Sequence, residues 1–137
     1  MQKEFELELN HLDVLIKYLK EVIDEDCIVI LRGDLASGKT TLVKNYVKAL
    51  GLPDLVTSPT FSLQAIYSDS IFHYDVYNKT LGEFISLGML EEFEKQGVHF
   101  VEWGDEKLEE ILNDYGYKVI LIEIEKKDNK RLYKINA

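Results

Sequence analysis

The clearest chemical signal in the chain is a glycine-rich loop that matches the pattern for binding phosphate. Its residues are Gly33, Asp34, Leu35, Ala36, Ser37, Gly38, Lys39 and Thr40. The two glycines allow backbone angles that side chains forbid, so successive N–H groups can converge on phosphate oxygens. Lys39 can reach the β- and γ-phosphates of a nucleotide, and Thr40 can bind Mg²⁺. A strand of buried type precedes the loop and a helix follows it, which is the context that this chemistry requires.

A phosphate loop of this kind needs a second acidic group for the metal, and that group typically ends an apolar strand. Two residues qualify. Glu102 follows the apolar residues 98–101, and Asp75 follows residues 71–74. Each could instead be a surface group at a strand end. Asp34 lies inside the loop, where it is better suited to bonding backbone groups than to contacting an anionic substrate.

A proline turn, Ser-Pro-Thr-Phe at residues 58–61, is a further candidate segment. Pro59 fixes its own backbone and restricts Ser58, so Thr60 is presented from a defined bend. In nucleotide-dependent switches such a segment orders around the γ-phosphate and the metal. The alternative is an ordinary turn leading into a strand, and the spacing alone leaves both open.

The tryptophan and the histidines give weaker signals. Trp103, the only tryptophan, adjoins Glu102 at a strand end, where it could pack in the core or face a base or a partner. His11, His73 and His99 are dispersed without the spacing of metal ligands. We therefore expect packing roles for all three histidines.

Length and composition limit the class of protein. The 137 residues predict a single domain, residues 1–137, large enough to bury a core. The single cysteine, Cys27, excludes an internal disulfide and fits a reducing compartment. No apolar run is long enough to span a bilayer, and the charged, alternating start is unlike a signal peptide. We expect a cytoplasmic protein without a membrane partner.

The charge balance argues against a nucleic-acid-binding protein. The net charge is −9, from 16 Lys and Arg against 25 Asp and Glu, and affinity for nucleic acid depends mostly on phosphate neutralisation. Residues 91–125 are strongly acidic, and they offer either a docking face for a basic partner or a solvated surface. A short basic segment at residues 126–134 could touch a polyanion, but a solvated hairpin is the simpler interpretation.

The hydrophobic pattern predicts strands that alternate with helices. Strands are expected at residues 5–9, 27–31, 60–67, 71–77, 98–103, 117–125 and 131–135. Helices are expected at residues 12–23 with Asn10 as the cap, 38–50, 80–96 with interruptions at Gly82 and Gly88, and 106–113 with Asp105 as the cap. This order predicts an α/β layered fold like that of phosphate-loop NTPases, with a mostly parallel central sheet and flanking antiparallel strands.

Four segments together resemble the TsaE family, the small bacterial ATPases of tRNA threonylcarbamoyladenosine biosynthesis. They are residues 33–41 (GDLASGKTT), 57–61 (TSPTF), 73–77 (HYDVY) and 100–103 (FVEW), and the resemblance covers about residues 5–125. It implies binding of ATP and Mg²⁺ with slow hydrolysis. It also implies assembly with the protein pair that transfers threonylcarbamoyl to the adenosine beside the anticodon, so that tRNA is contacted only through that complex.

The resemblance also implies roles for individual residues. Nucleotide binding falls to Asp34, Leu35, Ala36, Ser37, Gly38, Lys39, Thr40 and Thr41. Thr40 and Glu102 would hold Mg²⁺, and Trp103 would lie beside them. Thr60 would belong to a nucleotide-sensing switch and Asp75 to the acidic site. Glu102, Asp75 and Thr60 are therefore the catalytic candidates.

The chain departs from the family's pattern at three places. Ala36-Ser37 replaces a common Gly-Ala, Asn78 a common arginine, and Gly104 a usual proline. The change at Asn78 leaves a charge-stabilising role at that position unsupported.

Two other functions share the phosphate loop: a small-molecule kinase, and a nucleotide-binding module without hydrolysis. Kinases need several cations around the transferred group, and the only arginines are Arg32 and Arg131. An autonomous kinase is therefore disfavoured, whereas the binding module remains an alternative.

Overall fold

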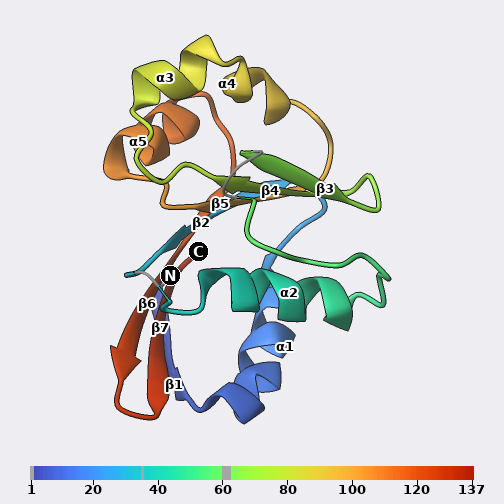
Figure 1. Ribbon diagram of the computed structural model, residues 1–137, viewed down its shortest axis with the longest axis vertical. Coiled ribbons are helices and arrows are strands. Elements are labelled where there is room, and N and C mark those ends of the chain that lie inside the picture. Colours follow the sequence, from blue (N-terminus) through green and yellow to red (C-terminus); the bar gives the residue numbers. More distant parts are fainter. Residues whose placement is uncertain (1, 35, 60–62) are drawn as a thin grey trace.

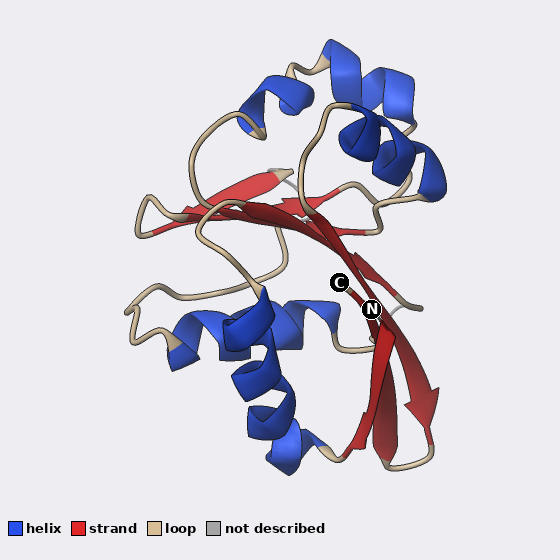
Figure 2. Cartoon of the chain, turned by 180° about the vertical axis from the view of Figure 1, so that it is seen from behind, coloured by secondary structure: helices blue, strands red, loops and turns tan. Residues whose placement is uncertain are grey.

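The structure, a computed structural model, describes residues 2–34, 36–59 and 63–137. A seven-stranded sheet runs through the molecule, and helices cover both of its faces (Figure 1, Figure 2). The strands are β1 (Gln2–Leu7), β2 (Cys27–Arg32), β3 (Gln64–Tyr67), β4 (Ile71–Asp75), β5 (Val98–Glu102), β6 (Val119–Lys127) and β7 (Lys130–Asn136). The helices are a 3₁₀ turn η1 (Leu9–His11), α1 (Leu12–Val22), α2 (Lys39–Ala49), α3 (Leu81–Ser86), α4 (Met89–Glu92) and α5 (Glu106–Asp114). No helix in the described ranges is both long enough and apolar enough to cross a membrane.

The centre of the sheet is parallel. The strand order is β1-β7-β6-β2-β5-β4-β3. The strands β6, β2, β5 and β4 run parallel, whereas β1, β7 and β3 pair antiparallel with their neighbours. Strand β2 is buried along nearly its whole length, which explains its continuous apolar sequence. The predicted α/β fold, with a mostly parallel sheet and flanking antiparallel strands, is confirmed.

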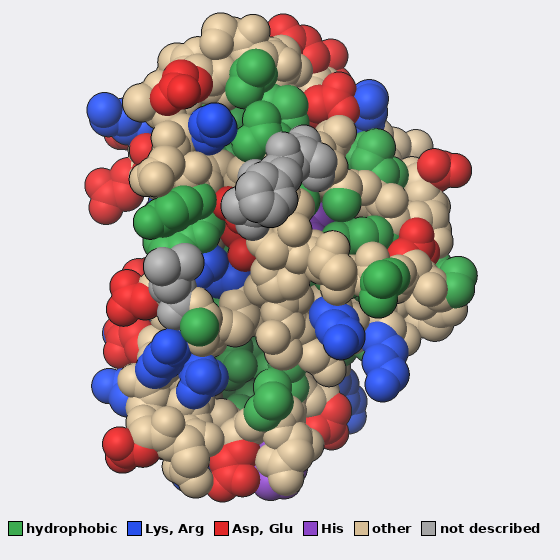
Figure 3. Space-filling model, viewed as in Figure 1, with side chains coloured by type: hydrophobic (Ala, Val, Ile, Leu, Met, Phe, Trp, Pro, Cys, Tyr) green, Lys and Arg blue, Asp and Glu red, His purple; other side chains and the backbone are tan. Residues whose placement is uncertain are grey.

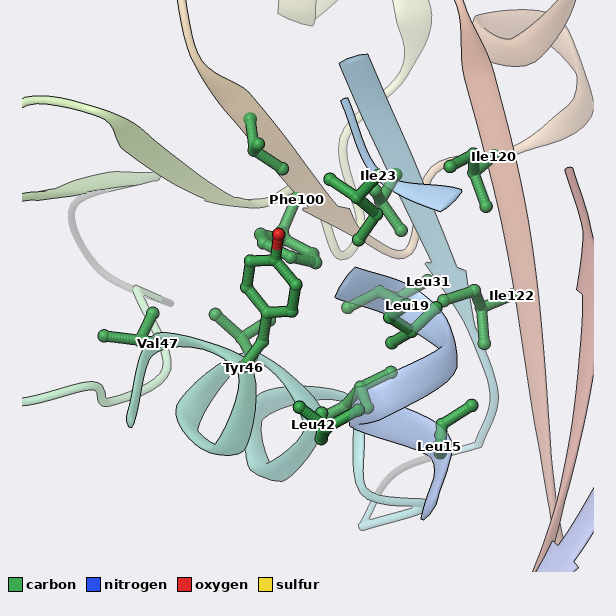
Figure 4. Close-up of a cluster of buried hydrophobic side chains, with 14 of the residues drawn as sticks. Leu15, Leu19, Ile23, Leu31, Leu42, Tyr46, Val47, Phe100, Ile120 and Ile122 are labelled. Carbon is green, nitrogen blue, oxygen red and sulfur yellow. The ribbon is translucent and has the colours of Figure 1, made fainter. Parts of the chain in front are cut away.

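The two faces of β2 belong to two hydrophobic cores. Val29 and Leu31 point into the core formed with α1 and α2, and Ile28 and Ile30 into the core formed with α3, α4 and α5. Figure 4 shows Leu31 beside Leu19 of α1 in the first core. Because successive side chains of a strand point to opposite faces, this strand is held on both sides and its end is fixed in place.

The parallel register brings three strand ends to one edge of the sheet. Asp75, the last residue of β4, lies opposite Glu102, the last residue of β5, and Glu102 in turn lies opposite Leu31 of β2. The phosphate loop follows directly after β2. The topology therefore brings the loop and both acidic candidates to the same edge.

Two local predictions are wrong. Asn10 does not cap α1, because the chain first makes the 3₁₀ turn Leu9–His11 and the helix then begins with His11 at the cap position. Gly82 does not interrupt α3, because it lies in a first turn that is fixed by a reciprocal pair of hydrogen bonds between Thr80 and Glu83. The break at Gly88 is confirmed: this glycine has φ 74° and precedes α4.

Candidate functional site

The phosphate loop joins the end of β2 to the start of α2. Gly38 has φ 113°, a left-handed conformation that glycine adopts without strain. The sequence suggested that Gly33 provides unusual backbone angles, but in the structure Gly33 is needed because there is no room for a side chain. A Cβ atom there would lie 2.5 Å from the Ser37 hydroxyl oxygen and 2.8 Å from the Ile124 carbonyl oxygen. The first glycine thus allows the loop to pack closely against itself and against β6, and the second allows the turn into the helix.

Lys39 is folded back onto the loop. Its ammonium donates to the carbonyl oxygens of Gly33 at 2.7 Å and Asp34 at 3.0 Å. It also lies 3.9 Å from the centre of the Trp103 ring. Burial lowers the pKa of this ammonium, and the nearby carboxylates, Glu102 foremost, oppose that shift. A buried ammonium of this kind is a ready partner for an anion that enters the loop.

Both acidic candidates lie beside the loop. Among the described residues, a hydrogen bond joins Glu102 to the loop, whereas Asp75 has other partners. The Thr40 hydroxyl donates to Glu102 Oε2 at 2.7 Å. Asp75 instead accepts from the backbone N–H of Tyr77 at 3.0 Å and from the Ser58 hydroxyl at 3.3 Å. Both carboxylates are buried. The geometry therefore pairs Glu102 with Thr40 and ties Asp75 to the proline-containing segment.

Trp103 is neither a core residue nor an isolated surface group. It has φ 71°, and its ring packs at 4.7 Å from the ring of Tyr77. Together with the Lys39 contact, this makes the indole part of the wall of the site.

A hollow of about 940 Å³, which includes its open side, lies between the loop and the acidic strand ends. It is lined by Ala36, Ser37, Gly38, Lys39, Thr40, Thr41, Ser58, Asp75, Tyr77, Glu102 and Trp103. In Figure 3, acidic and basic side chains meet on this face between the two groups of undescribed residues. The structure thus brings together most of the residues expected from the sequence. Leu35 and Thr60 lie outside the described residues, and Asp34 does not line the hollow.

His73 is the residue of the site that sequence reasoning missed. Its Nε2 atom lies 2.5 Å from Glu102 Oε2, and the side chain is fully buried. Packing was the expected role, because the histidines lack metal-ligand spacing. The available signal was the alternation of β4: His73 and Asp75 are two residues apart, so both point to the same face of the sheet.

Both arginines are engaged elsewhere. Arg32 donates to the Gly104 carbonyl oxygen at 2.7 Å and pairs with Glu109 of α5 at 2.9 Å. Arg131 of β7 donates to the Ser37 carbonyl oxygen at 3.0 Å. Arg32 thus turns toward α5, and Arg131 supports the loop through its backbone.

Comparisons with known proteins agree with this geometry. A family model described as threonylcarbamoyl adenosine biosynthesis protein TsaE matches residues 7–133. A tRNA threonylcarbamoyladenosine biosynthesis protein TsaE from Treponema pallidum is 38% identical over 93 residues, which cover 66% of this chain and 69% of the relative. The protein of the same name from Bacillus subtilis is 42% identical over 79 residues, which cover 56% of this chain and 49% of the relative.

The fold has a solved counterpart. The crystal structure of Bacillus subtilis YdiB matches with a TM-score of 0.72 and 25% sequence identity, covering 100% of this chain and 86% of that chain. The family match extends over most of the chain and includes the loop, both acidic strand ends and Trp103. The chain therefore belongs to the TsaE family of proteins, which take part in threonylcarbamoyladenosine biosynthesis on tRNA.

Proposed function

We propose that this protein binds ATP with Mg²⁺ and hydrolyses it slowly, as an accessory subunit of the complex that transfers threonylcarbamoyl to tRNA. One observation carries the proposal: the Thr40 hydroxyl and the Glu102 carboxylate meet at 2.7 Å beside the phosphate loop. Phosphate-loop enzymes use a loop hydroxyl and an acidic strand end to hold the metal against the nucleotide's phosphates. Family membership supports the pathway in which this activity would serve.

The phosphates would bind in the loop, where backbone N–H groups and the start of α2 act as donors. The hollow has a cavity volume of about 490 Å³, which is in the range of small-molecule sites, roughly 300–1,000 Å³. Lys39 would exchange its contacts to the Gly33 and Asp34 carbonyls for phosphate oxygens, which carry more negative charge. The ammonium would then neutralise part of the phosphate charge.

Thr40 and Glu102 fit a bound Mg²⁺. No cluster of three or more His, Cys, Asp or Glu side chains among the described residues could hold a metal by itself. Mg²⁺ is usually bound through one or two carboxylates together with substrate phosphates, so one hydroxyl and one carboxylate suffice. The ion would neutralise charge on the transferred phosphoryl group. Asp75 and Thr60 remain the other catalytic candidates.

The same site explains why hydrolysis is expected to be slow. Phosphate-loop proteins without a catalytic arginine turn over slowly, and an arginine supplied by a partner can raise the rate by about 10³–10⁵. Arg32 contacts Gly104 and Glu109, Arg131 holds the Ser37 carbonyl, and neither arginine lines the hollow. A partner protein is therefore the proposed source of the missing cation, and the lack of such cations argues against a kinase.

The partner is proposed to be the threonylcarbamoyl-transfer protein complex, with tRNA reached only through it. The net charge of −9 disfavours direct RNA binding. The acidic residues 91–125 would speed association with a basic partner surface and fix its orientation more than they would add affinity.

Calorimetry and phosphate release test the proposal. The full chain should bind ATP in the presence of Mg²⁺, release phosphate slowly, and change its rate when the transfer proteins are added. Lys39→Ala should lose nucleotide binding while its melting temperature stays close to that of the wild type. Binding without turnover, even with the partners present, would favour the binding module instead. Fast turnover by the isolated chain would favour an independent enzyme.

A further inference from the structure

A chain of buried hydrogen bonds leads from the candidate site into the core. Glu102 Oε2 lies 2.5 Å from His73 Nε2, and His73 Nδ1 lies 2.9 Å from the Tyr67 hydroxyl. That hydroxyl lies 3.4 Å from the carbonyl oxygen of Thr57. The chain thus connects the end of β5 to the segment before Pro59, through two strands that are adjacent in the sheet.

The side chains of this path are removed from water. His73 is 0% exposed, Glu102 3% and Tyr67 4%. Hydrogen bonds at such depth are strong, and losing one leaves a polar group unsatisfied. The path is therefore able to hold its members in one arrangement.

The path also specifies the direction of each bond. A carboxylate oxygen can only accept, so His73 Nε2 carries a proton and donates it to Glu102. In the neutral imidazole, Nδ1 then accepts from the Tyr67 hydroxyl. The longer 3.4 Å contact to Thr57 fits this assignment, because one hydroxyl proton can serve only one acceptor.

We propose that His73 is a positioning residue: it holds Glu102 in the orientation that meets Thr40, and the Tyr67 hydroxyl in turn holds the His73 imidazole. Glu102 Oε2 receives donors from two sides, Thr40 at 2.7 Å and His73 at 2.5 Å. Two donors on one oxygen fix the plane of the carboxylate. No hydrogen bond between described residues ends on the other oxygen, which is thereby directed for use by the metal or its water. The inference rests on the proposed function, because it assigns His73 a role toward the metal carboxylate.

The far end of the path gives this positioning a second consequence. Thr57 and Ser58 are consecutive residues, and Ser58 donates to Asp75 Oδ2 at 3.3 Å. This short segment therefore contacts the end of β4 directly and the end of β5 through Tyr67 and His73.

Two substitutions at His73 test the contacts of its two ring nitrogens separately. The amide nitrogen of glutamine reaches about as far as Nε2, so His73→Gln keeps a donor for Glu102 and gives up the Tyr67 contact. The shorter asparagine reaches about as far as Nδ1, so His73→Asn keeps the Tyr67 contact and gives up Glu102. Tyr67→Phe removes only a hydroxyl and serves as the third variant.

The readout is the affinity for ADP, measured by calorimetry on the full chain with Mg²⁺ and again with EDTA. Residues that orient metal ligands typically contribute about 10–100-fold to metal affinity. We expect His73→Asn to lower the Mg²⁺-dependent gain in affinity by that amount, and His73→Gln to lower it by less than about tenfold. ADP affinity in EDTA should stay near the wild-type value in both. Mn²⁺ bound with ADP, followed by electron paramagnetic resonance, should show an altered spectrum in His73→Asn alone.

Tyr67→Phe tests the longer path. It should lower the Mg²⁺-dependent gain several-fold in the wild type and add nothing in His73→Gln, where the link to Tyr67 is already absent. Equal losses in the two His73 variants, or losses that persist in EDTA, would overturn the positioning role. If Tyr67→Phe lowers the Mg²⁺-dependent gain as much in His73→Gln as in the wild type, Tyr67 does not act through His73. This comparison does not need His73→Asn, so it can be made even if that variant fails to fold. A wild type without Mg²⁺-dependent ADP binding would overturn the proposed function itself, and this inference with it.

Discussion

Two histidines on neighbouring strands share one pattern of contacts and differ in a single acceptor. His73 of β4 and His99 of β5 are both buried, and each places Nδ1 against a tyrosine hydroxyl, at 2.9 Å to Tyr67 and 2.6 Å to Tyr74. The other nitrogen makes the difference. His73 Nε2 contacts a side-chain carboxylate that lines the hollow, whereas His99 Nε2 contacts the backbone carbonyl of Lys95 at 2.8 Å.

The residues around the two histidines also differ. The register pairs Phe72 with His99 and His73 with Phe100, so the two imidazoles point to opposite faces of the sheet. His99 stacks on Phe72 at 4.4 Å with nearly parallel rings, and Phe93 packs against its edge. A buried histidine therefore belongs to the fold when its partners are backbone and aromatic groups. It belongs to the site when it holds a side chain that faces the hollow.

The largest effect is expected on the His73 face. Glu102→Gln keeps the size of the side chain but removes the negative charge of the carboxylate to which His73 and Thr40 donate hydrogen bonds. Mg²⁺-dependent ATP turnover should fall by more than the roughly 10–100-fold that is typical of residues around metal ligands. The melting temperature should change little. Phosphate release under saturating Mg²⁺ measures this effect, and wild-type turnover in the variant would remove Glu102 from the site.

The complementary effect is expected on the His99 face. His99→Leu leaves the Lys95 carbonyl without its partner and removes one contact of the Tyr74 hydroxyl, which also has a hydrogen bond with Gln64. An unsatisfied buried group costs about 1–3 kcal/mol. Urea denaturation should report a free energy of unfolding lowered by a few kcal/mol. Mg²⁺-dependent ADP affinity should remain at the wild-type value. A large loss of that affinity without a loss of stability would break the distinction between the two histidines.

The pH dependence of folding stability provides a further test of the role assigned to His99. Burial lowers the pKa of His99, while its bond to the Lys95 carbonyl and the nearby acidic groups Asp26 and Glu92 oppose the shift. The unfolded chain then binds a proton below about pH 6.5 that the folded chain does not yet bind, so stability falls as the pH drops. The contribution of one histidine is at most about 1.4 kcal/mol per pH unit, and it levels off below the folded-state pKa.

The check is the difference between the wild type and His99→Leu, measured by urea denaturation from pH 7.5 to 5. The wild type should lose stability more steeply than the variant below about pH 6.5. Parallel curves would mean that His99 does not titrate differently in the folded and unfolded chain.

The smallest effect is optical and concerns the edge of the hollow. An entering phosphate would draw the Lys39 ammonium away from the Trp103 ring, which lies 3.9 Å from it. Tryptophan emission should therefore change when ADP is added, in the wild type and equally in His99→Leu. Unchanged emission at saturating ADP would mean that Lys39 keeps its contact with the indole when the nucleotide binds.

The sequence predicted the elements well where a local pattern determined them. The apolar run at residues 27–31 and the Asp105 cap both appear as expected. For the candidate site, the motifs indicated residues that the structure brings to one edge of the sheet, namely the loop, Glu102 and Asp75, and their roles stay predictions. The pairing of Glu102 rather than Asp75 with Thr40 depends on the relative position of three strand ends, and no local pattern contains that information.

Other features could not be predicted because they depend on contacts between distant segments. His73 reaches Glu102 only because β4 and β5 pair in parallel, 29 residues apart in sequence. Gly33 is required because the carbonyl of Ile124, on β6, lies against it. The predicted Asn10 cap was wrong for a local reason: the 3₁₀ turn Leu9–His11 places His11, and not Asn10, at the cap position of α1.

The pairing of β1 with β7 has a consequence for how the chain acquires its structure. Gln2 lies opposite Asn136, so β1 pairs with the strand that is farthest from it in the sequence of the described chain. Closing so long a loop carries a large entropic cost before any contact offsets it. The alternating glutamates at positions 4 and 6 place charge along β1, which discourages pairing with other chains while β1 is unpaired. We therefore expect the edge formed by β1 and β7 to form later in folding than the parallel centre of the sheet.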